Sequence, residues 1–247
     1  MQTSHFTKFE NLLLRSKNEL GTSVLLILAW IATSDGTIDQ AEAKRLSKIS
    51  VDTKHGRDVH QITELAKNRD LDAIELACEV VQRYFREEKA TLFLEMAIGM
   101  AIADGYLLPE ENHILRFLSD LLGVSRSSFN ALFVEMTGKE LPNPSDPSKA
   151  SFWKTRDGSQ RRKQSDSSSE STRASSPPPP DQKAVHSYAV LGLEWGATLE
   201  DVKRAYRRLA QVHHPDRFSS LGEESVAAAT STFQRIKEAY DYLVNHA

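Results

Sequence analysis

Residues 211–218, QVHHPDRF, place two histidines, a proline and an aspartate between two stretches with helical periodicity. An imidazole and a carboxylate two positions apart suit acid–base catalysis, metal binding or recognition of a partner. Catalysis is disfavoured because no nucleophile or phosphate-binding loop accompanies the pair, and we expect no enzymatic activity and no cofactor. A metal site is disfavoured because adjacent histidines in a loop rarely both bind one ion. The pattern therefore favours recognition of a partner, with His213 as a spacer.

Two amphipathic helices are predicted to hold this loop. Thr198 and Asp201 form a capping box for a helix that ends near Val212, and a second helix covers about residues 223–245. Helices joined by a loop of about eight residues should pack antiparallel as a hairpin. Pro215 prevents the first helix from continuing and favours an extended His214. We therefore expect HHPDRFSS to be the exposed tip of the hairpin.

Four basic residues follow the exposed side of the first of these helices. They cluster at one- and four-residue spacing, and they are Lys203, Arg204, Arg207 and Arg208. Basic residues on a helix are most often a solvated face. Beside a His-Pro-Asp tip, however, they favour a docking surface for an acidic partner.

Residues 186–247 resemble a J domain, the module that defines DnaJ-type co-chaperones. The pattern of that family is met at Tyr188, Leu191-Gly192, Ala197-Thr198, Lys203, Ala205-Tyr206-Arg207, Leu209-Ala210, His214-Pro215-Asp216-Arg217, Phe233, Ile236 and Ala239-Tyr240. The resemblance implies docking on a DnaK-type chaperone and stimulation of its ATP hydrolysis. It further implies that the partner contacts the four basic residues together with His214, Pro215, Asp216 and Arg217.

The amino-terminal part, residues 1–140, is predicted to be a helical bundle with an internal two-fold repeat. Residues 27–49 align with residues 97–118, and each unit contains an apolar helix, an Asp-Gly turn and an amphipathic helix. The whole chain is therefore expected to be all-α, because β-type alternation is almost absent.

The repeat brings four carboxylates to equivalent positions, Asp35 with Asp104 and Glu42 with Glu111. One interpretation is a divalent metal site, although an EF-hand is excluded because most ligand positions lack carboxylates. The other, which we favour, is structural: each Asp ends a helix, glycine turns the chain, and each Glu lies in the first turn of the next helix.

The repeat resembles the TerB-like domain of tellurite resistance, and residues 92–133 resemble the DjlA family of co-chaperones. This resemblance implies a role in targeting or in binding a client, both of which are unidentified. An alternative is a metal- or ligand-sensing stress module, in which the TerB-like domain is the functional unit and the J domain an adaptor.

Residues 141–185 are rich in serine and proline and predict a disordered linker. The formal charge of −3 argues against a nucleic-acid binder. The most apolar segment, residues 24–32, is shorter than the roughly 20 residues that span a bilayer. DjlA-like proteins typically begin with a membrane anchor, which is not found here, so we expect a cytoplasmic protein without a membrane span. The single cysteine, Cys78, fits a reducing compartment and is expected to be buried.

Overall fold

The computed structural model describes residues 6–34, 58–102, 105–144, 146, 148–149 and 181–246. Within these ranges the chain forms ten α-helices and one 3-10 helix, and no strand. The predicted all-α class is confirmed for this part of the chain. Residues 150–180, which make up most of the predicted linker, lie outside the described residues, so their disorder stays a prediction.

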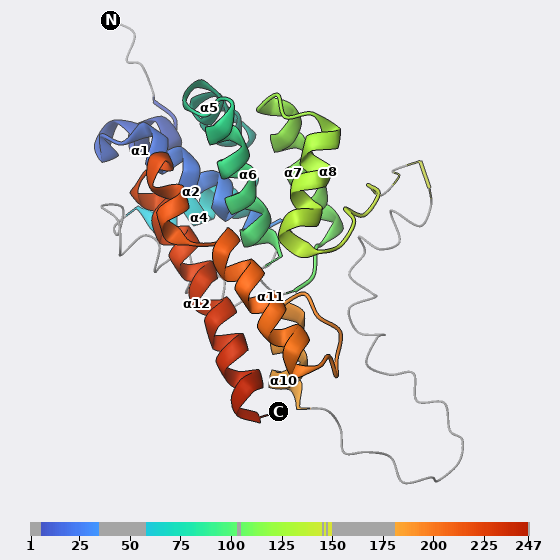
Figure 1. Ribbon diagram of the computed structural model, residues 1–247. Coiled ribbons are helices and arrows are strands. Elements are labelled where there is room, and N and C mark those ends of the chain that lie inside the picture. Colours follow the sequence, from blue (N-terminus) through green and yellow to red (C-terminus); the bar gives the residue numbers. More distant parts are fainter. Residues whose placement is uncertain are drawn as a thin grey trace, which may run out of the picture.

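The N-terminal domain contains seven of these helices (Figure 1): α1 (Lys8–Ser16), α2 (Glu19–Ala32), α4 (Val59–Lys67), α5 (Leu71–Tyr84), α6 (Glu88–Ala101), α7 (Pro109–Leu121) and α8 (Arg126–Thr137). Ten of the 14 residues of α2 are buried, which makes it a central helix because apolar residues cover it on nearly all sides. It packs against α1, α4, α5, α6 and α7, and α8 packs against α6 and α7.

The internal repeat is recognisable at its first helix. Helices α2 and α6 each contain 14 residues and begin and end at equivalent positions of the repeat. In the second unit, Gly105 has φ of +84°, the left-handed conformation expected after the Asp-Gly turn. The amphipathic helix predicted after residue 35 of the first unit lies outside the described residues, so the repeat is supported only at α2 and α6.

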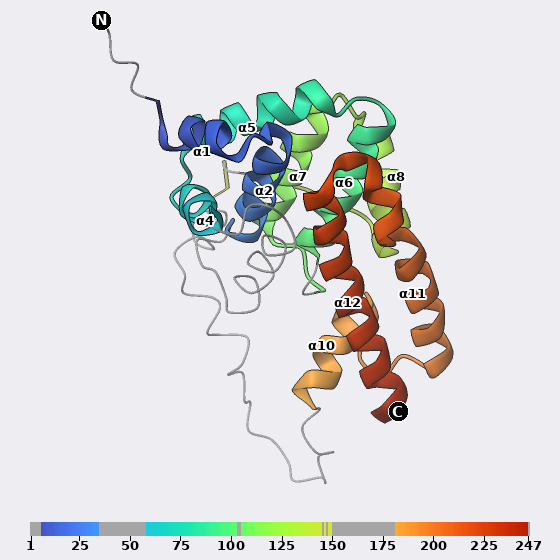
Figure 2. The same cartoon turned by 90° about the vertical axis from the view of Figure 1, so that its left-hand side faces the viewer.

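The C-terminal domain, which is the region that resembles a J domain and is called the J domain for that reason, contains α10 (Gln182–Val190), α11 (Leu199–Val212), the 3-10 helix η1 (Pro215–Leu221) and α12 (Glu223–His246). The hydroxyl of Thr198 accepts a hydrogen bond from the backbone N–H of Asp201 at 3.2 Å, which caps α11 as predicted. Helices α11 and α12 pack side by side, and α10 packs on α12 (Figure 2). Residues 182–185, which were predicted as linker, instead belong to α10.

Two hydrophobic clusters organise the described residues. One is internal to the J domain: Leu191, Val202, Ala205, Leu209, Ile236, Ala239 and Leu243. The other is the core of the N-terminal domain, and it also includes J-domain residues near the tip of the hairpin: Val212, Phe218, Leu221, Ala228 and Ala229. Phe218 and Leu221 of η1 therefore pack into the N-terminal domain. The prediction of an exposed tip is wrong for His213 and Phe218 and confirmed for His214 and Asp216.

Candidate functional site

The His-Pro-Asp segment opens η1. His214 is extended, with φ of −65° and ψ of 127°, as its position before proline predicted. Its Nδ1 accepts a hydrogen bond from the backbone N–H of Asp216 at 3.3 Å, so His214 caps the 3-10 helix. Its ring packs edge-on against Phe233, with the ring centres 5.8 Å apart. The hydrogen bond and the ring contact together fix the orientation of the His-Pro-Asp segment.

Two of its side chains remain accessible. The side chain of His214 is 50% exposed and that of Asp216 is 92% exposed. An imidazole that accepts at Nδ1 carries its proton on Nε2, which leaves a donor available to a partner. The pair thus presents one hydrogen-bond donor and one carboxylate acceptor side by side.

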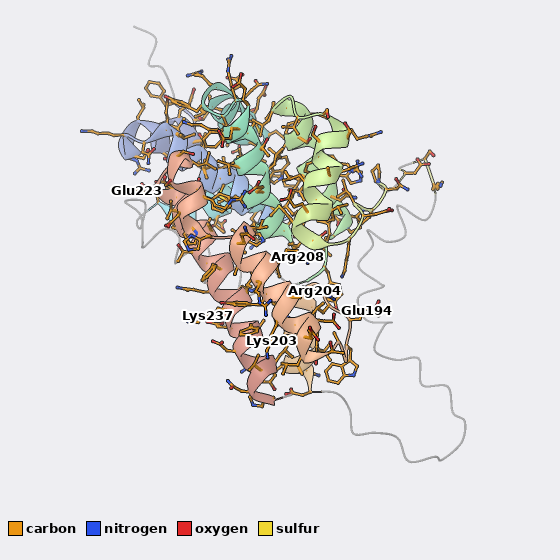
Figure 3. The ribbon with its side chains drawn as sticks, in the orientation of Figure 1. Glu194, Lys203, Arg204, Arg208, Glu223 and Lys237 are labelled. Carbon is orange, nitrogen blue, oxygen red and sulfur yellow. The ribbon has the colours of Figure 1, made fainter. Side chains whose placement is uncertain are left out.

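The basic face, which comprises Lys203, Arg204, Arg207 and Arg208, lies along α11 as predicted. The first three are exposed, and Arg204 forms an ion pair with Asp201 one turn earlier. Figure 3 shows Lys203 and Arg204 on the part of α11 farther from the N-terminal domain and Arg208 on the part closer to it. The face therefore runs along α11 toward the end that leads into the His-Pro-Asp segment.

Arg208 differs from the other three because the N-terminal domain partly covers it. Its Nη2 donates to the backbone oxygen of Thr137, the last residue of α8, at 3.3 Å. The oxygen belongs to the electronegative end of that helix, which favours a guanidinium there. Burial lowers the pKa of Arg208, although an arginine keeps its charge in proteins. The prediction that all four basic residues would be exposed is wrong for Arg208.

Arg217, which follows Asp216, also contacts the N-terminal domain. Its Nη2 lies 2.9 Å and 3.1 Å from the two carboxylate oxygens of Glu95 in α6. Its Nη1 donates to the backbone oxygen of Val212 at 2.7 Å. The Glu95 side chain is 8% exposed, and burial raises its pKa while Arg217 acts in the opposite direction.

His213 is the residue whose role the sequence did not reveal. It was interpreted as a spacer in an exposed loop, but it is 2% exposed. Its imidazole occupies the space beside Gly99 of α6, where a Cβ atom would lie 2.6 Å from its Cε1. Burial, and to a lesser degree the charge of Arg217, lowers the pKa of His213 to about 4. The available signal was Gly99 itself, a glycine inside an apolar helix.

Of the four candidate metal ligands, Asp35, Glu42 and Asp104 lie outside the described residues. The fourth, Glu111, accepts a hydrogen bond from the backbone N–H of Leu108 at 2.8 Å. That bond places Glu111 in the capping arrangement of α7, as the structural interpretation expected. No group of three or more potential metal-binding side chains occurs among the residues that the structure describes. The metal-sensing alternative stays a prediction.

Cys78 is a buried free thiol in α5, as expected. Burial, with a smaller contribution from Glu75, raises its pKa to about 12, so the thiolate is scarce at neutral pH. Among the residues that the structure describes, no helix combines the length and the apolar character needed to cross a membrane.

Comparisons with known proteins match the N-terminal and the C-terminal parts of the chain to two different families. The family model described as tellurite resistance protein TerB matches residues 21–133, and the DnaJ domain model matches residues 186–247. The chain thus contains a TerB domain and a DnaJ domain. No solved structure matches the chain.

Several bacterial relatives carry the name co-chaperone protein DjlA. The protein from Vibrio vulnificus strain YJ016 is 25% identical over 235 residues, which cover 92% of this chain and 78% of that protein. The one from Mannheimia succiniciproducens is 27% identical over 225 residues, 88% of this chain and 76% of that protein. The one from Photorhabdus laumondii is 30% identical over 162 residues, 64% of this chain and 52% of that protein. The DnaJ domain and these relatives support a co-chaperone function.

Proposed function

We propose that this chain, in which a TerB domain precedes a DnaJ domain, is a co-chaperone whose J domain docks on a DnaK-type chaperone and accelerates its ATP hydrolysis. The observation that carries the proposal is the arrangement at the end of α11. His214 and Asp216 are exposed at the start of η1, just after the helix whose exposed side carries Lys203, Arg204 and Arg207. A partner that contacts one of these groups can therefore contact the other.

The two parts of this surface contribute differently. Lys203, Arg204 and Arg207 supply long-range attraction to an acidic surface, which raises the association rate and orients the encounter more than it adds affinity. His214, Pro215 and Asp216 then engage the junction between the nucleotide-binding domain of the chaperone and its linker. They accelerate hydrolysis only if they bind the hydrolysis-competent state more tightly than the other state. The chain itself supplies binding energy and no catalytic group.

The N-terminal domain, in this proposal, binds a client or a targeting protein. Support comes from the co-chaperone relatives, because their similarity extends through both domains of the chain. Recruitment of the chaperone by the J domain would then occur where the N-terminal domain is bound.

The test is single-turnover ATP hydrolysis by a DnaK-type chaperone from the same organism, with and without the full chain. We expect stimulation by the wild-type chain and its loss in His214→Gln, because glutamine cannot reproduce the imidazole geometry at the start of η1. His60→Gln is the matched control, since His60 is an exposed histidine on α4 of the other domain. Equal stimulation by His214→Gln and the wild type would refute the docking role of the tip. No stimulation by either would refute the proposed activity.

A further inference from the structure

Two cations that the J domain offers to a chaperone are engaged by its own N-terminal domain. Arg208 is bound to the Thr137 carbonyl at the end of α8, and Arg217 is bound to the buried carboxylate of Glu95 in α6. Arg217 has one terminal nitrogen on Glu95 and the other on the backbone oxygen of Val212, so it cannot at the same time use both in a bidentate contact with an acidic partner. Helix η1, which carries Asp216, also packs on α6 and thereby limits access to the tip from that side.

Apolar contacts reinforce these polar ones. Phe218 is 0% exposed and Leu221 is 1% exposed, and both belong to the core of the N-terminal domain. These two side chains of η1 are therefore a hydrophobic anchor, with the Arg217–Glu95 pair beside them. An exposed loop that only displayed His214 and Asp216 would have no need for such an anchor.

Two glycines in the N-terminal domain allow the J domain to approach this closely. At Gly99 of α6, the three atoms nearest to an added Cβ all belong to His213. At Gly21 of α2, an added Cβ would lie 2.3 Å from the side chain of Glu224 in α12. Glu224 is buried there and accepts a hydrogen bond from Asn18 at 2.9 Å. Glycine weakens a helix relative to alanine, so its presence at both points of approach fits a selected interface.

We infer that the N-terminal domain and the DnaK-type chaperone compete for the same face of the J domain. The closed arrangement is defined by the contacts Arg208–Thr137, His213–Gly99 and Arg217–Glu95, and it limits the access of the chaperone to the J domain. Release of η1 from α6 exposes the full docking surface. This inference rests on the proposed function. His214, Asp216, Lys203 and Arg207 stay accessible when the arrangement is closed, so a chaperone can make first contact before the release.

The consequence is a coupling between the two domains. A client or targeting protein that binds the N-terminal domain more tightly when it is open shifts the population toward release. A chaperone that needs Arg208 and Arg217 has its apparent affinity reduced by the fraction of chains that are open.

The experiment uses changes in the N-terminal domain alone, so that no docking residue is altered. Gly99→Val puts a branched side chain into the space of the His213 ring, and Glu95→Gln removes the charge that holds Arg217. Their controls on the same helix are Lys89→Val and Glu88→Gln, both at exposed positions. Each full-length chain is titrated into a single-turnover ATP hydrolysis assay with the DnaK-type chaperone.

We expect both interface variants to reach half-maximal stimulation at about three- to tenfold lower concentration than the wild type, because a larger fraction is open. The controls should match the wild type, and adding His214→Gln should abolish stimulation in every chain. If Glu95→Gln and Gly99→Val behave like the wild type, or stimulate less while keeping their helical content, competition is refuted and the proposed function still stands. Should no chain stimulate at all, it is the proposed function that fails. Should Gly99→Val not fold, the isosteric Glu95→Gln alone decides.

Discussion

The carboxylate of Glu95 lies 2.9 Å from the guanidinium of Arg217, a residue of the other domain that directly follows the His-Pro-Asp segment. Glu95 is one of the buried residues of α6, and Arg217 is its partner across the domain boundary. The pair joins a buried carboxylate of the N-terminal domain to the segment that presents His214 and Asp216.

Phe218 is expected to be the strongest apolar contact between the domains. Because it is fully buried, Phe218→Ala should lower the free energy of unfolding by about 3–5 kcal/mol, through lost burial and the cavity that remains. Leu199→Ala, at a site that is 40% exposed, is the control and should cost about 0.5 kcal/mol or less. Urea unfolding followed by circular dichroism measures both. Equal costs would contradict the burial of η1 in the N-terminal core.

Acidification should weaken the closed arrangement through His213. The pKa of its imidazole is about 4 when buried and returns toward its usual value of 6.5 when η1 is released. The released form therefore binds the proton first, so the closed form has its full stability above about pH 6.5 and loses it as the pH falls toward 4. The raised pKa of Glu95 works in the opposite direction at pH values above its usual 4.5, so the comparison with a His213 variant is what isolates the contribution of His213.

Energy transfer between dyes on Lys89→Cys and Lys237→Cys would follow this opening. Cys78 should stay unlabelled, because it is buried and its pKa is raised to about 12. The transfer should decrease between pH 7 and 5.5 in the wild-type background and stay constant in His213→Gln. An unchanged pH response in His213→Gln would assign the opening to another group.

The exposed part of the basic face should control how stimulation depends on salt. Replacing Lys203 and Arg207 together by alanine removes two accessible charges and should raise the half-maximal concentration roughly three- to tenfold at low salt. The difference from the wild type should shrink between about 50 and 300 mM salt, since screening already weakens the wild-type interaction there. Titrations of ATP hydrolysis at both salt concentrations measure this. A change of the same size in Lys89→Ala, which removes a charge from the N-terminal domain, would show a nonspecific effect.

Variants of Glu111 distinguish the structural interpretation of the repeat from the interpretation as a metal site. If its role is to cap α7, Glu111→Ala should cost about 0.5–2 kcal/mol of stability, while Glu111→Gln should cost little because glutamine can accept the same hydrogen bond. Trp30 packs edge-on against Phe117 of α7, with ring centres 6.0 Å apart, and its fluorescence should then be insensitive to divalent cations. A saturable response that disappears in Glu111→Gln would instead support the metal site.

Local signals in the sequence were sufficient to predict the hairpin of the J domain. Thr198 and Pro215 determine where α11 begins and where it cannot continue, and both effects act within a few residues. The basic face and the extended His214 follow from the same local rules. The Glu111 cap was also predictable, because an acidic residue in the first turn of a helix is a short-range preference.

The burial of the tip could not be predicted in this way. His213 and Phe218 lie in a polar segment, and their burial depends on α6, which is more than 100 residues earlier in the chain. Nothing in the periodicity of α11 or α12 specifies that partner. Gly99 and Glu95 were the signs of a contact on α6, a small residue and a charge in an apolar helix, but neither identifies what approaches it.

The contact between Arg208 and the end of α8 has a stoichiometric consequence. An inhibitor on a separate chain would have to be kept at a level matched to that of the J domain. Here the competing surface is part of the same chain, so every J domain carries one copy of it at any level of expression. Dilution cannot separate the two, so only a ligand that distinguishes the open chain from the closed one can change the fraction of J domains available to the chaperone.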